Sequence, residues 1–297
     1  MKFPQSLKNF SIFIGLVLVV LVVRYNYTTL PVSSEEIALV NDTNNFAKAG
    51  FELGEETGIT PEIDILAQAA GAFSEGGKEV FGWETNKRWP IASLTKLMTA
   101  VIALEHMDTN QIAIMSPEAM AIESPSGGFS LGGKYRINDL IRAMLLVSSN
   151  DAAEQIALTF GRDEFIKAMN GKALELGMTE TNFIDPTGLS ARNQSTINDL
   201  VRLTEYIRLF RPEMLATTKK TSGTITEVKT GKRRTLNNIN PLASGKDFIG
   251  GKTGSTPEAG GNLISVFNIG GGPKIIIILG ADDKFAETTK VKNSLWQ

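Results

Sequence analysis

The sequence contains no cysteine and a single histidine, His106, among its 297 residues. Without cysteine the protein can form no disulfide, no thiol nucleophile and no thiolate metal site. A Ser-His-Asp triad would have to use His106, and a zinc site built from several histidines is excluded. We therefore expect no metal and no cofactor, and hydrolytic chemistry in this chain needs a base other than histidine.

The sequence also lacks any excess of charge, since 30 Lys and Arg residues face 32 Asp and Glu residues and the formal net charge is −2. This balance gives no reason to expect a nucleic-acid partner. Hydrophobic residues make up 42% of the chain, a fraction typical of a globular protein. The length allows a substantial core.

One long apolar run occurs, from residue 10 to residue 23, and it follows Lys2 and Lys8 and ends before Arg24. A cationic start and a short apolar core are typical of an export signal. As a helix the run spans roughly 21 Å, which is short for a membrane-crossing segment but usable with its flanks. An uncleaved membrane anchor is favoured, and a cleaved signal peptide and a buried core helix are the alternatives. Either export segment places the rest of the chain on the extracytoplasmic face of the cell membrane.

The chain divides into residues 1–24 as the export segment, a polar tether over 25–60 and one folded domain over 61–297. Within the domain we expect a β-hairpin from residues 63–73 and 78–83, and a helix from Ser93 to about Met107. Further helices are predicted at 138–147, 151–160, 163–176 and 196–210, and strands at 248–255, 261–269 and 274–281. Strands at both ends with helices between them predict an α+β fold whose terminal strands meet in one antiparallel sheet.

Ser93 and Lys96 stand three residues apart at the start of the first predicted helix, so their side chains share one face. Serine becomes a strong nucleophile only when a base removes its proton. A lysine can be that base when burial or a nearby cation lowers its pKa. The same pattern also fits a helix cap in which Ser93 binds a backbone N–H and Lys96 lies in solvent. Taken alone, the pair does not decide between the two.

Ser148 and Asn150 lie between two predicted helices, in a Ser-Ser-Asn segment. A hydroxyl at this place can relay a proton to a leaving group, and an amide can hold a substrate carbonyl. A helix N-cap without chemical function is the alternative interpretation.

Lys-Thr-Gly occurs twice, at residues 229–231 and 252–254. The first copy lies among charged residues, which is typical of a solvated hairpin turn. The second copy precedes an apolar strand. A strand-borne lysine and threonine next to a glycine form an edge that can bind a carboxylate. We therefore assign function to Lys252 rather than to Lys229.

The order Ser-x-x-Lys, Ser-x-Asn and Lys-Thr-Gly resembles the signature of β-lactamases and penicillin-binding proteins. From about residue 63 to residue 296 the chain resembles the D-alanyl-D-alanine carboxypeptidase family, the low-molecular-mass penicillin-binding proteins of serine type. The segments that carry the likeness are residues 90–100, 148–153, 185–189 (Asp-Pro-Thr-Gly-Leu), 238–242 (Asn-Ile-Asn-Pro-Leu) and 251–256.

The resemblance implies a penicillin-binding-protein/β-lactamase-like transpeptidase fold, with an antiparallel sheet and a helical subdomain. It implies a carboxypeptidase that trims peptidoglycan stem peptides ending in D-Ala-D-Ala through an acyl-enzyme on Ser93, and that β-lactams inhibit. The implied catalytic residues are Ser93, Lys96, Ser148, Asn150 and Lys252. The implied substrate-binding residues are Thr253, Gly254, Ser255 and Thr256, with an oxyanion hole from the backbone N–H groups of Ser93 and Ser255.

One departure from the family pattern concerns the arginine that the members with the fullest activity often carry after the last long strand, where it helps to hold the substrate carboxylate. No arginine follows Arg234 here, and the cations beyond the last predicted strand are Lys284, Lys290 and Lys292. A DD-endopeptidase, a class A-like β-lactamase and an inactive wall-binding protein are the alternatives to a carboxypeptidase. A β-lactamase needs a carboxylate for its deacylating water, and Asp185 is the one acid between residues 183 and 189.

Overall fold

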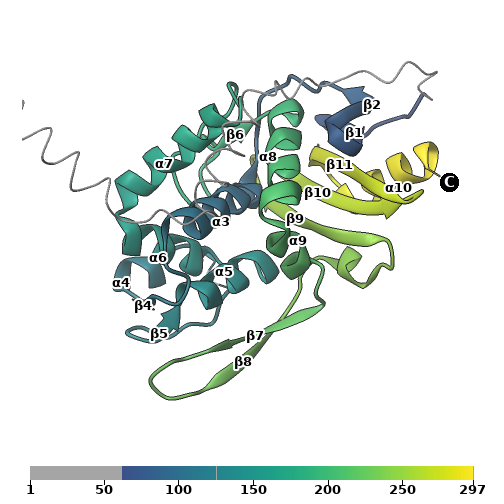
Figure 1. The fold of residues 1–297 in the computed structure, drawn as a ribbon. Coiled ribbons are helices and arrows are strands. Elements are labelled where there is room, and N and C mark those ends of the chain that lie inside the picture. Colours follow the sequence, from purple (N-terminus) through teal and green to yellow (C-terminus); the bar gives the residue numbers. More distant parts are fainter. Residues whose placement is uncertain (1–61, 125, 297) are drawn as a thin grey trace, which may run out of the picture. The chain divides into compact units, whose positions relative to one another are not determined.

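The computed structural model of the protein describes residues 62–124 and 126–296, so the predicted export segment and tether lie outside these residues. No helix within the described ranges is both long and apolar enough to cross a membrane. The described chain folds into a five-stranded antiparallel sheet and a group of helices (Figure 1).

The sheet joins the two ends of the described chain. β1 (Ala69–Ser74) and β2 (Lys78–Trp83) form a hairpin, and β9 (Phe248–Thr256), β10 (Gly260–Ile269) and β11 (Gly272–Ala281) form an antiparallel meander. The strand order is β2-β1-β11-β10-β9, and β1 pairs with β11 so that Ala70 lies opposite Ile278. The predicted meeting of the terminal strands is confirmed, and β9 with its Lys-Thr-Gly motif is an edge strand.

The central strand β11 is buried on both faces, which explains its unbroken apolar run from Ile275 to Ile278. Alternate side chains of a strand point to opposite faces. Ile276 and Ile278 belong to the same core cluster as Val291 of α10 (Lys284–Leu295). On the other face α8 (Ile197–Phe210) packs against β1 and β11. Helix α10 thus packs on one face of the sheet, and α8 packs on the other face over β1 and β11.

The helical part surrounds α3 (Thr95–His106), which follows a single 3₁₀ turn at Ala92–Leu94 and is buried from Thr95 to Ala103. The helices that pack around α3 are α5 (Ile137–Leu146), α6 (Asn150–Phe160) and α7 (Arg162–Glu175). The shorter helices are α4 (Pro117–Met120) against α6 and α9 (Pro212–Thr218) against α5 and β9.

Three two-stranded ribbons lie outside the main sheet in the described chain. They are β3 (Trp89–Pro90) with β6 (Gln194–Ser195), β4 (Ile112–Ile114) with β5 (Lys134–Arg136), and β7 (Ser222–Thr226) with β8 (Arg233–Asn237). The β7–β8 hairpin, at the bottom of Figure 1, packs against α5 along β7, and its turn contacts β5. Two further 3₁₀ turns lie at Glu75–Gly77 and Pro241–Ser244.

The predicted helices are confirmed as α3, α5, α6, α7 and α8, and the three predicted C-terminal strands are confirmed as β9, β10 and β11. The first strand was predicted too long, because it starts at Ala69 and Ile63 packs against the core cluster outside the sheet. Helix α10 was not predicted. Its sequence is polar, and Glu287, Thr288 and Val291 are its buried residues, so it shows no amphipathic period.

Candidate active site

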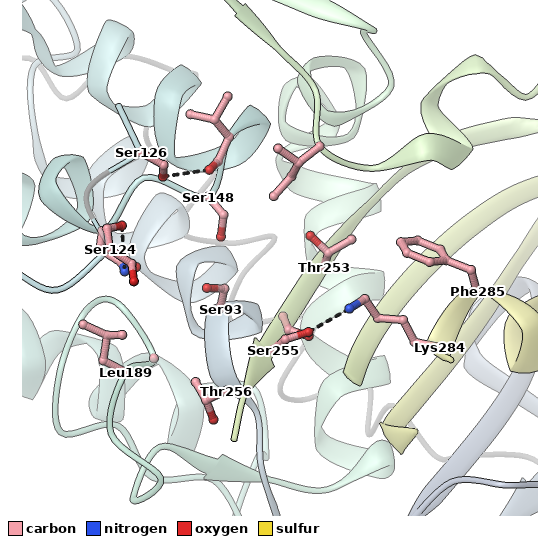
Figure 2. A pocket seen from close by; sticks show the side chains of 15 residues that line it. Ser93, Ser124, Ser126, Ser148, Leu189, Thr253, Ser255, Thr256, Lys284 and Phe285 are labelled. Atoms are coloured by element: carbon pink, nitrogen blue, oxygen red, sulfur yellow. Dashed lines mark hydrogen bonds between the residues drawn. The ribbon is translucent and has the colours of Figure 1, made fainter. Parts of the chain in front are cut away.

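Residues from all three predicted motifs line one pocket of about 380 Å³ between β9 and the helical part (Figure 2). The 3₁₀ turn before α3 contributes one serine, the junction of α5 and α6 contributes a second serine and an amide, and β9 contributes four residues. The members of this set are Ser93, Ser148, Asn150, Thr253, Gly254, Ser255 and Thr256. Thr256 stands at the end of β9, where its hydroxyl also accepts the N–H of Ala259 at 3.2 Å.

Lys96 is inaccessible to solvent, and its Nζ lies 2.9 Å from Ser93 Oγ. The other partners of Nζ are Asn150 Oδ1 at 2.7 Å and the backbone carbonyl of Thr187 at 2.6 Å. Burial lowers the pKa of Lys96 well below its usual value, and the charge of Lys252 lowers it further. A neutral amine has two N–H groups and one lone pair. The two oxygen acceptors therefore take the N–H groups and leave the lone pair for the Ser93 proton.

Asn150 connects Lys96 to the backbone of residues 123 and 124. Its Nδ2 donates to the carbonyl oxygens of Glu123 at 2.9 Å and Ser124 at 3.4 Å, while Oδ1 accepts from Lys96. The sequence pattern allowed this amide to hold a substrate carbonyl. The geometry adds a contact that can orient the lysine, and the substrate contact stays a prediction.

Both carboxylate oxygens of Asp185 are used by the turn that this residue begins. Oδ1 accepts the N–H groups of Thr187 and Gly188 at 2.7 Å each, and Oδ2 accepts the N–H of Ser190 at 3.1 Å. These bonds hold the turn whose Thr187 carbonyl reaches Lys96. A carboxylate engaged in this way is not placed to activate a water, which argues against the β-lactamase alternative.

Lys252 links β9 to the second serine of the site. Its side chain is buried, and Nζ lies 2.9 Å from Ser148 Oγ and 2.8 Å from the carbonyl of Thr253. Burial lowers the pKa of Lys252 to about 7, with a smaller contribution from the charge of Lys284. Figure 2 shows the hydroxyls of Ser148 and Ser93 in the same pocket, so a leaving group formed at Ser93 can receive a proton through Ser148.

The first Lys-Thr-Gly copy, at residues 229–231, lies in the turn between β7 and β8, as predicted from its charged surroundings. Thr230 donates through both its N–H and its hydroxyl to Glu227 Oε2, at 2.6 Å each. Lys229 is exposed at this turn. The structure thus brings Lys252, and not Lys229, into contact with the other site residues.

Lys284 lines the pocket. The sequence offered three cations after the last strand, Lys284, Lys290 and Lys292, and no pattern distinguished Lys284 from the other two. Lys284 begins α10, and its Nζ donates to Ser255 Oγ at 2.7 Å (Figure 2). β9 pairs with β10 and β10 with β11, so the end of β11 lies near Ser255. Lys290 and Lys292 instead form ion pairs with carboxylates outside the pocket. Spatial register across the sheet, and not a sequence motif, places Lys284.

The turn that carries Ser93 is fixed by close contacts on two sides. A Cβ on Gly188 would lie 1.9 Å from the carbonyl oxygen of Ala92, and a Cβ on Gly254 would lie 3.0 Å from the Ser93 nitrogen. Ala92 itself has φ +48° and Ser148 has φ +57°, a left-handed conformation that costs roughly 1–3 kcal/mol for such residues. The strain sets the direction of both hydroxyl-bearing segments. It also brings the Ser93 N–H beside β9.

No group of three or more His, Asp or Glu side chains within the described ranges is arranged to hold a metal ion. Activation of a serine by a buried lysine is characteristic of the penicillin-recognising serine enzymes, and the sheet and helices have the arrangement of that class. A family model for D-alanyl-D-alanine carboxypeptidase matches residues 64–283, and the chain belongs to this family of serine peptidases.

Individual relatives agree with this assignment. The chain is 32% identical over 238 residues to a D-alanyl-D-alanine endopeptidase of Pseudomonas aeruginosa, an alignment that covers 74% of this chain and 73% of that protein. It is 28% identical over 227 residues to the D-alanyl-D-alanine carboxypeptidase DacF of Bacillus subtilis, over 72% of this chain and 58% of that protein.

Solved structures confirm the predicted fold. A D-alanyl-D-alanine carboxypeptidase of Mycobacterium tuberculosis superposes with a TM-score of 0.75 at 26% identity, over 81% of this chain and 94% of that chain. A penicillin-binding protein of Listeria monocytogenes with ampicillin bound superposes with a TM-score of 0.70 at 31% identity, over 79% of this chain and 98% of that chain.

We expect Gly188→Ala to slow covalent penicillin labelling on the order of 100-fold, because the added methyl displaces the turn that carries Ser93 and small displacements in an active site have effects of this size. The measurement is the rate of covalent labelling by a fluorescent penicillin. Gly171→Ala in α7 is the control, because beyond the adjacent residues and backbone of its own helix no atom lies within 4 Å of a Cβ at that position. Equal labelling rates for the two variants would contradict the proposed contact.

Proposed function

We propose that Ser93 is the nucleophile and Lys96 the base of a serine-type D-Ala-D-Ala carboxypeptidase that removes the terminal D-Ala from peptidoglycan stem peptides. The observation that carries this proposal is the contact of Lys96 Nζ with Ser93 Oγ at 2.9 Å, beside two oxygen acceptors that can take the N–H groups of the neutral amine. Lys96 takes the Ser93 proton while Oγ attacks the carbonyl carbon of the penultimate D-Ala.

The developing oxyanion accepts hydrogen bonds from the backbone N–H groups of Ser93 and Ser255, which the contact of Gly254 with the Ser93 turn brings together. When the C–N bond breaks, the leaving amine takes up the proton that Lys96 removed from Ser93, passed on through the hydroxyl of Ser148. Lys252, in contact with Ser148 Oγ, holds that hydroxyl in place. Free D-Ala then departs, and water hydrolyses the ester to restore Ser93.

The substrate is proposed to lie along β9, because an edge strand leaves half of its backbone N–H and C=O groups unpaired in the sheet. Its terminal carboxylate then reaches Ser255 and Lys284, whose side chains already share a hydrogen bond at 2.7 Å. Lys284 supplies the positive charge that an arginine supplies in many family members. Thr253 and Thr256 complete the wall on the same strand.

A DD-endopeptidase is the second candidate. The relatives from Pseudomonas aeruginosa and Haemophilus influenzae, 32% and 36% identical to this chain, both carry that name. The same acyl-enzyme on Ser93 forms in both reactions, and the difference is the leaving amine: free D-Ala in one case, the side-chain amine of a neighbouring stem peptide in the other.

Two substrates distinguish these candidates: a pentapeptide ending in D-Ala-D-Ala and a cross-linked muropeptide dimer. We expect wild-type enzyme to release free D-Ala from the pentapeptide, and Ser93→Ala to release none and to lose covalent penicillin labelling. Conversion of the dimer to monomers without free D-Ala would transfer the assignment to the endopeptidase. Undiminished acylation of Ser93→Ala would reject the nucleophile itself.

We also propose that the domain acts on the extracytoplasmic side of the membrane, held there by residues 1–24 and a tether over 25–60. The support is the cationic start and apolar run of the sequence and a wall-directed activity. Fractionation of cells that express the full chain, or a chain starting at residue 25, tests this. Retention of the full chain in the cytoplasm would reject it.

We expect Lys252→Ala to reduce acylation on the order of 100-fold, because it removes the partner of the Ser148 hydroxyl. Lys229→Ala, in the other Lys-Thr-Gly copy, is the matched control and should change acylation less than about threefold, since Lys229 is exposed at a hairpin turn. Rates of penicillin labelling decide between them. Equal losses in the two variants would show that β9 does not carry the functional copy.

Lys284→Gln should raise KM for the D-Ala-D-Ala peptide about tenfold, because the terminal carboxylate loses a charge-assisted hydrogen bond. The same substitution should also move the alkaline limb of the profile of kcat/KM against pH to higher pH. The charge of Lys284 helps to lower the pKa of Lys252 to about 7, so its removal raises that pKa and keeps Lys252 protonated to higher pH. A peptide with an amidated C-terminus is the control substrate, and its KM should not respond. An unchanged KM and an unchanged alkaline limb would together show that Lys284 does not act at the carboxylate.

A further inference from the structure

A second cleft, of about 430 Å³, lies between the β7–β8 hairpin and the segment from Gly128 to Tyr135. None of its lining residues takes part in the reaction proposed above. Its floor is apolar, with Tyr135 and Ile225, and Leu131 at its side is 65% exposed. Its wall on the hairpin is strongly basic.

Four cations line this cleft, Lys229, Lys232, Arg233 and Arg234, and all four are exposed. None of these four side chains forms an ion pair within the described ranges, although salt bridges occur elsewhere on the molecule. Arg234 Nη1 donates to the carbonyl of Gly128 at 2.6 Å and so spans the cleft. The local excess of positive charge contrasts with the net charge of −2 of the whole chain. An anionic ligand is the natural complement of such a surface.

One carboxylate, Glu227, lies among these cations, but it serves the hairpin itself. It accepts the N–H of Lys134 at 2.9 Å and both donors of Thr230 at 2.6 Å each. These hydrogen bonds lower the pKa of Glu227 to about 2, and the bond from the Thr230 side chain has the largest effect. Val228 N–H donates to the carbonyl of Lys134 at 2.8 Å. These hydrogen bonds hold the turn against β5. The backbone that carries the cations is therefore fixed, which reduces the conformational entropy that the hairpin loses when a ligand binds.

The cleft continues the walls of the Ser93 pocket. Ser124 and Ser126 line that pocket, and Gly128 lines the cleft. Two residues of extended chain span at most about 7 Å, so the two hollows adjoin along this segment. On the opposite side Ile239, which follows β8, lines the pocket, while β8 itself lines the cleft. A long ligand in the pocket therefore passes toward the basic hairpin.

The Ser93 pocket has room for the end of a stem peptide, whereas a wall polymer is far larger than about 380 Å³. Peptidoglycan carries free carboxylates on its peptides together with methyl groups of alanine. Basic side chains above an apolar floor match both features. We propose that this cleft binds carboxylates of the peptidoglycan that bears the scissile stem peptide. The proposal rests on the proposed function and adds a reason for preferring polymeric over short soluble substrate.

The test uses the full chain with Lys229→Gln, Lys232→Gln and Arg233→Gln combined, and leaves Arg234 in place because it binds Gly128. The control combines Arg88→Gln, Lys167→Gln and Lys246→Gln, which removes the same charge from exposed positions outside the cleft. We expect the cleft variant to bind insoluble peptidoglycan about tenfold more weakly in sedimentation, as three exposed ion pairs of ordinary strength predict. The deficit should shrink at high salt. D-Ala release from the soluble pentapeptide should change less than about twofold.

Peptidoglycan stripped of phosphate-containing polymers should bind wild type normally, and peptidoglycan with amidated carboxylates should bind wild type as weakly as it binds the variant. Equal weakening by the control triple, or loss of binding on removal of phosphate polymers, would overturn the proposal. So would an equal loss of activity on the soluble pentapeptide. Sedimentation with a Ser93→Ala background needs no turnover. It therefore tests the cleft even if wild type released no D-Ala and the proposed function failed.

Discussion

The hydrogen bonds of one buried amino group, Nζ of Lys96, hold the site together. Its three partners come from the nucleophile turn, from the start of α6 and from the Asp185 turn, segments far apart in the sequence. Burial of a charged amine without partners is costly, so the environment favours the neutral form, and two oxygen acceptors orient it. Asn150 accepts a hydrogen bond from this lysine, and the hydrogen bonds of Asp185 fix the turn whose Thr187 carbonyl accepts another.

Local patterns predicted the parts of the site that one segment determines by itself. The three-residue spacing of Ser93 and Lys96 brings their side chains into contact once a helix forms. The apolar run beside Lys252 distinguishes its Lys-Thr-Gly copy from the copy at Lys229, which lies among charged residues. These features depend on short-range geometry, which a sequence displays directly.

The parts that were missed depend on contacts between distant segments. The Thr187 carbonyl reaches Lys96 through a backbone atom, which every residue type carries, so no side-chain pattern marks it. Lys284 reaches Ser255 because of strand register across β10. Helix α10 was missed because it buries few apolar residues and is stabilised by the sheet beneath it rather than by its own period.

The strand order has a consequence for the time at which the enzyme becomes active during synthesis. β1 is among the first described segments to be made, yet its neighbour β11 is among the last, since Ala70 pairs with Ile278. The apolar side chains of the β1–β2 hairpin therefore stay uncovered by β11 until most of the polypeptide has been synthesised. β9 is likewise incomplete as a wall until β10 and β11 have joined it. The turn that carries Ser93 thus lacks β9 beside it while the chain is still emerging, and a folding rate governed by such distant pairings is slow.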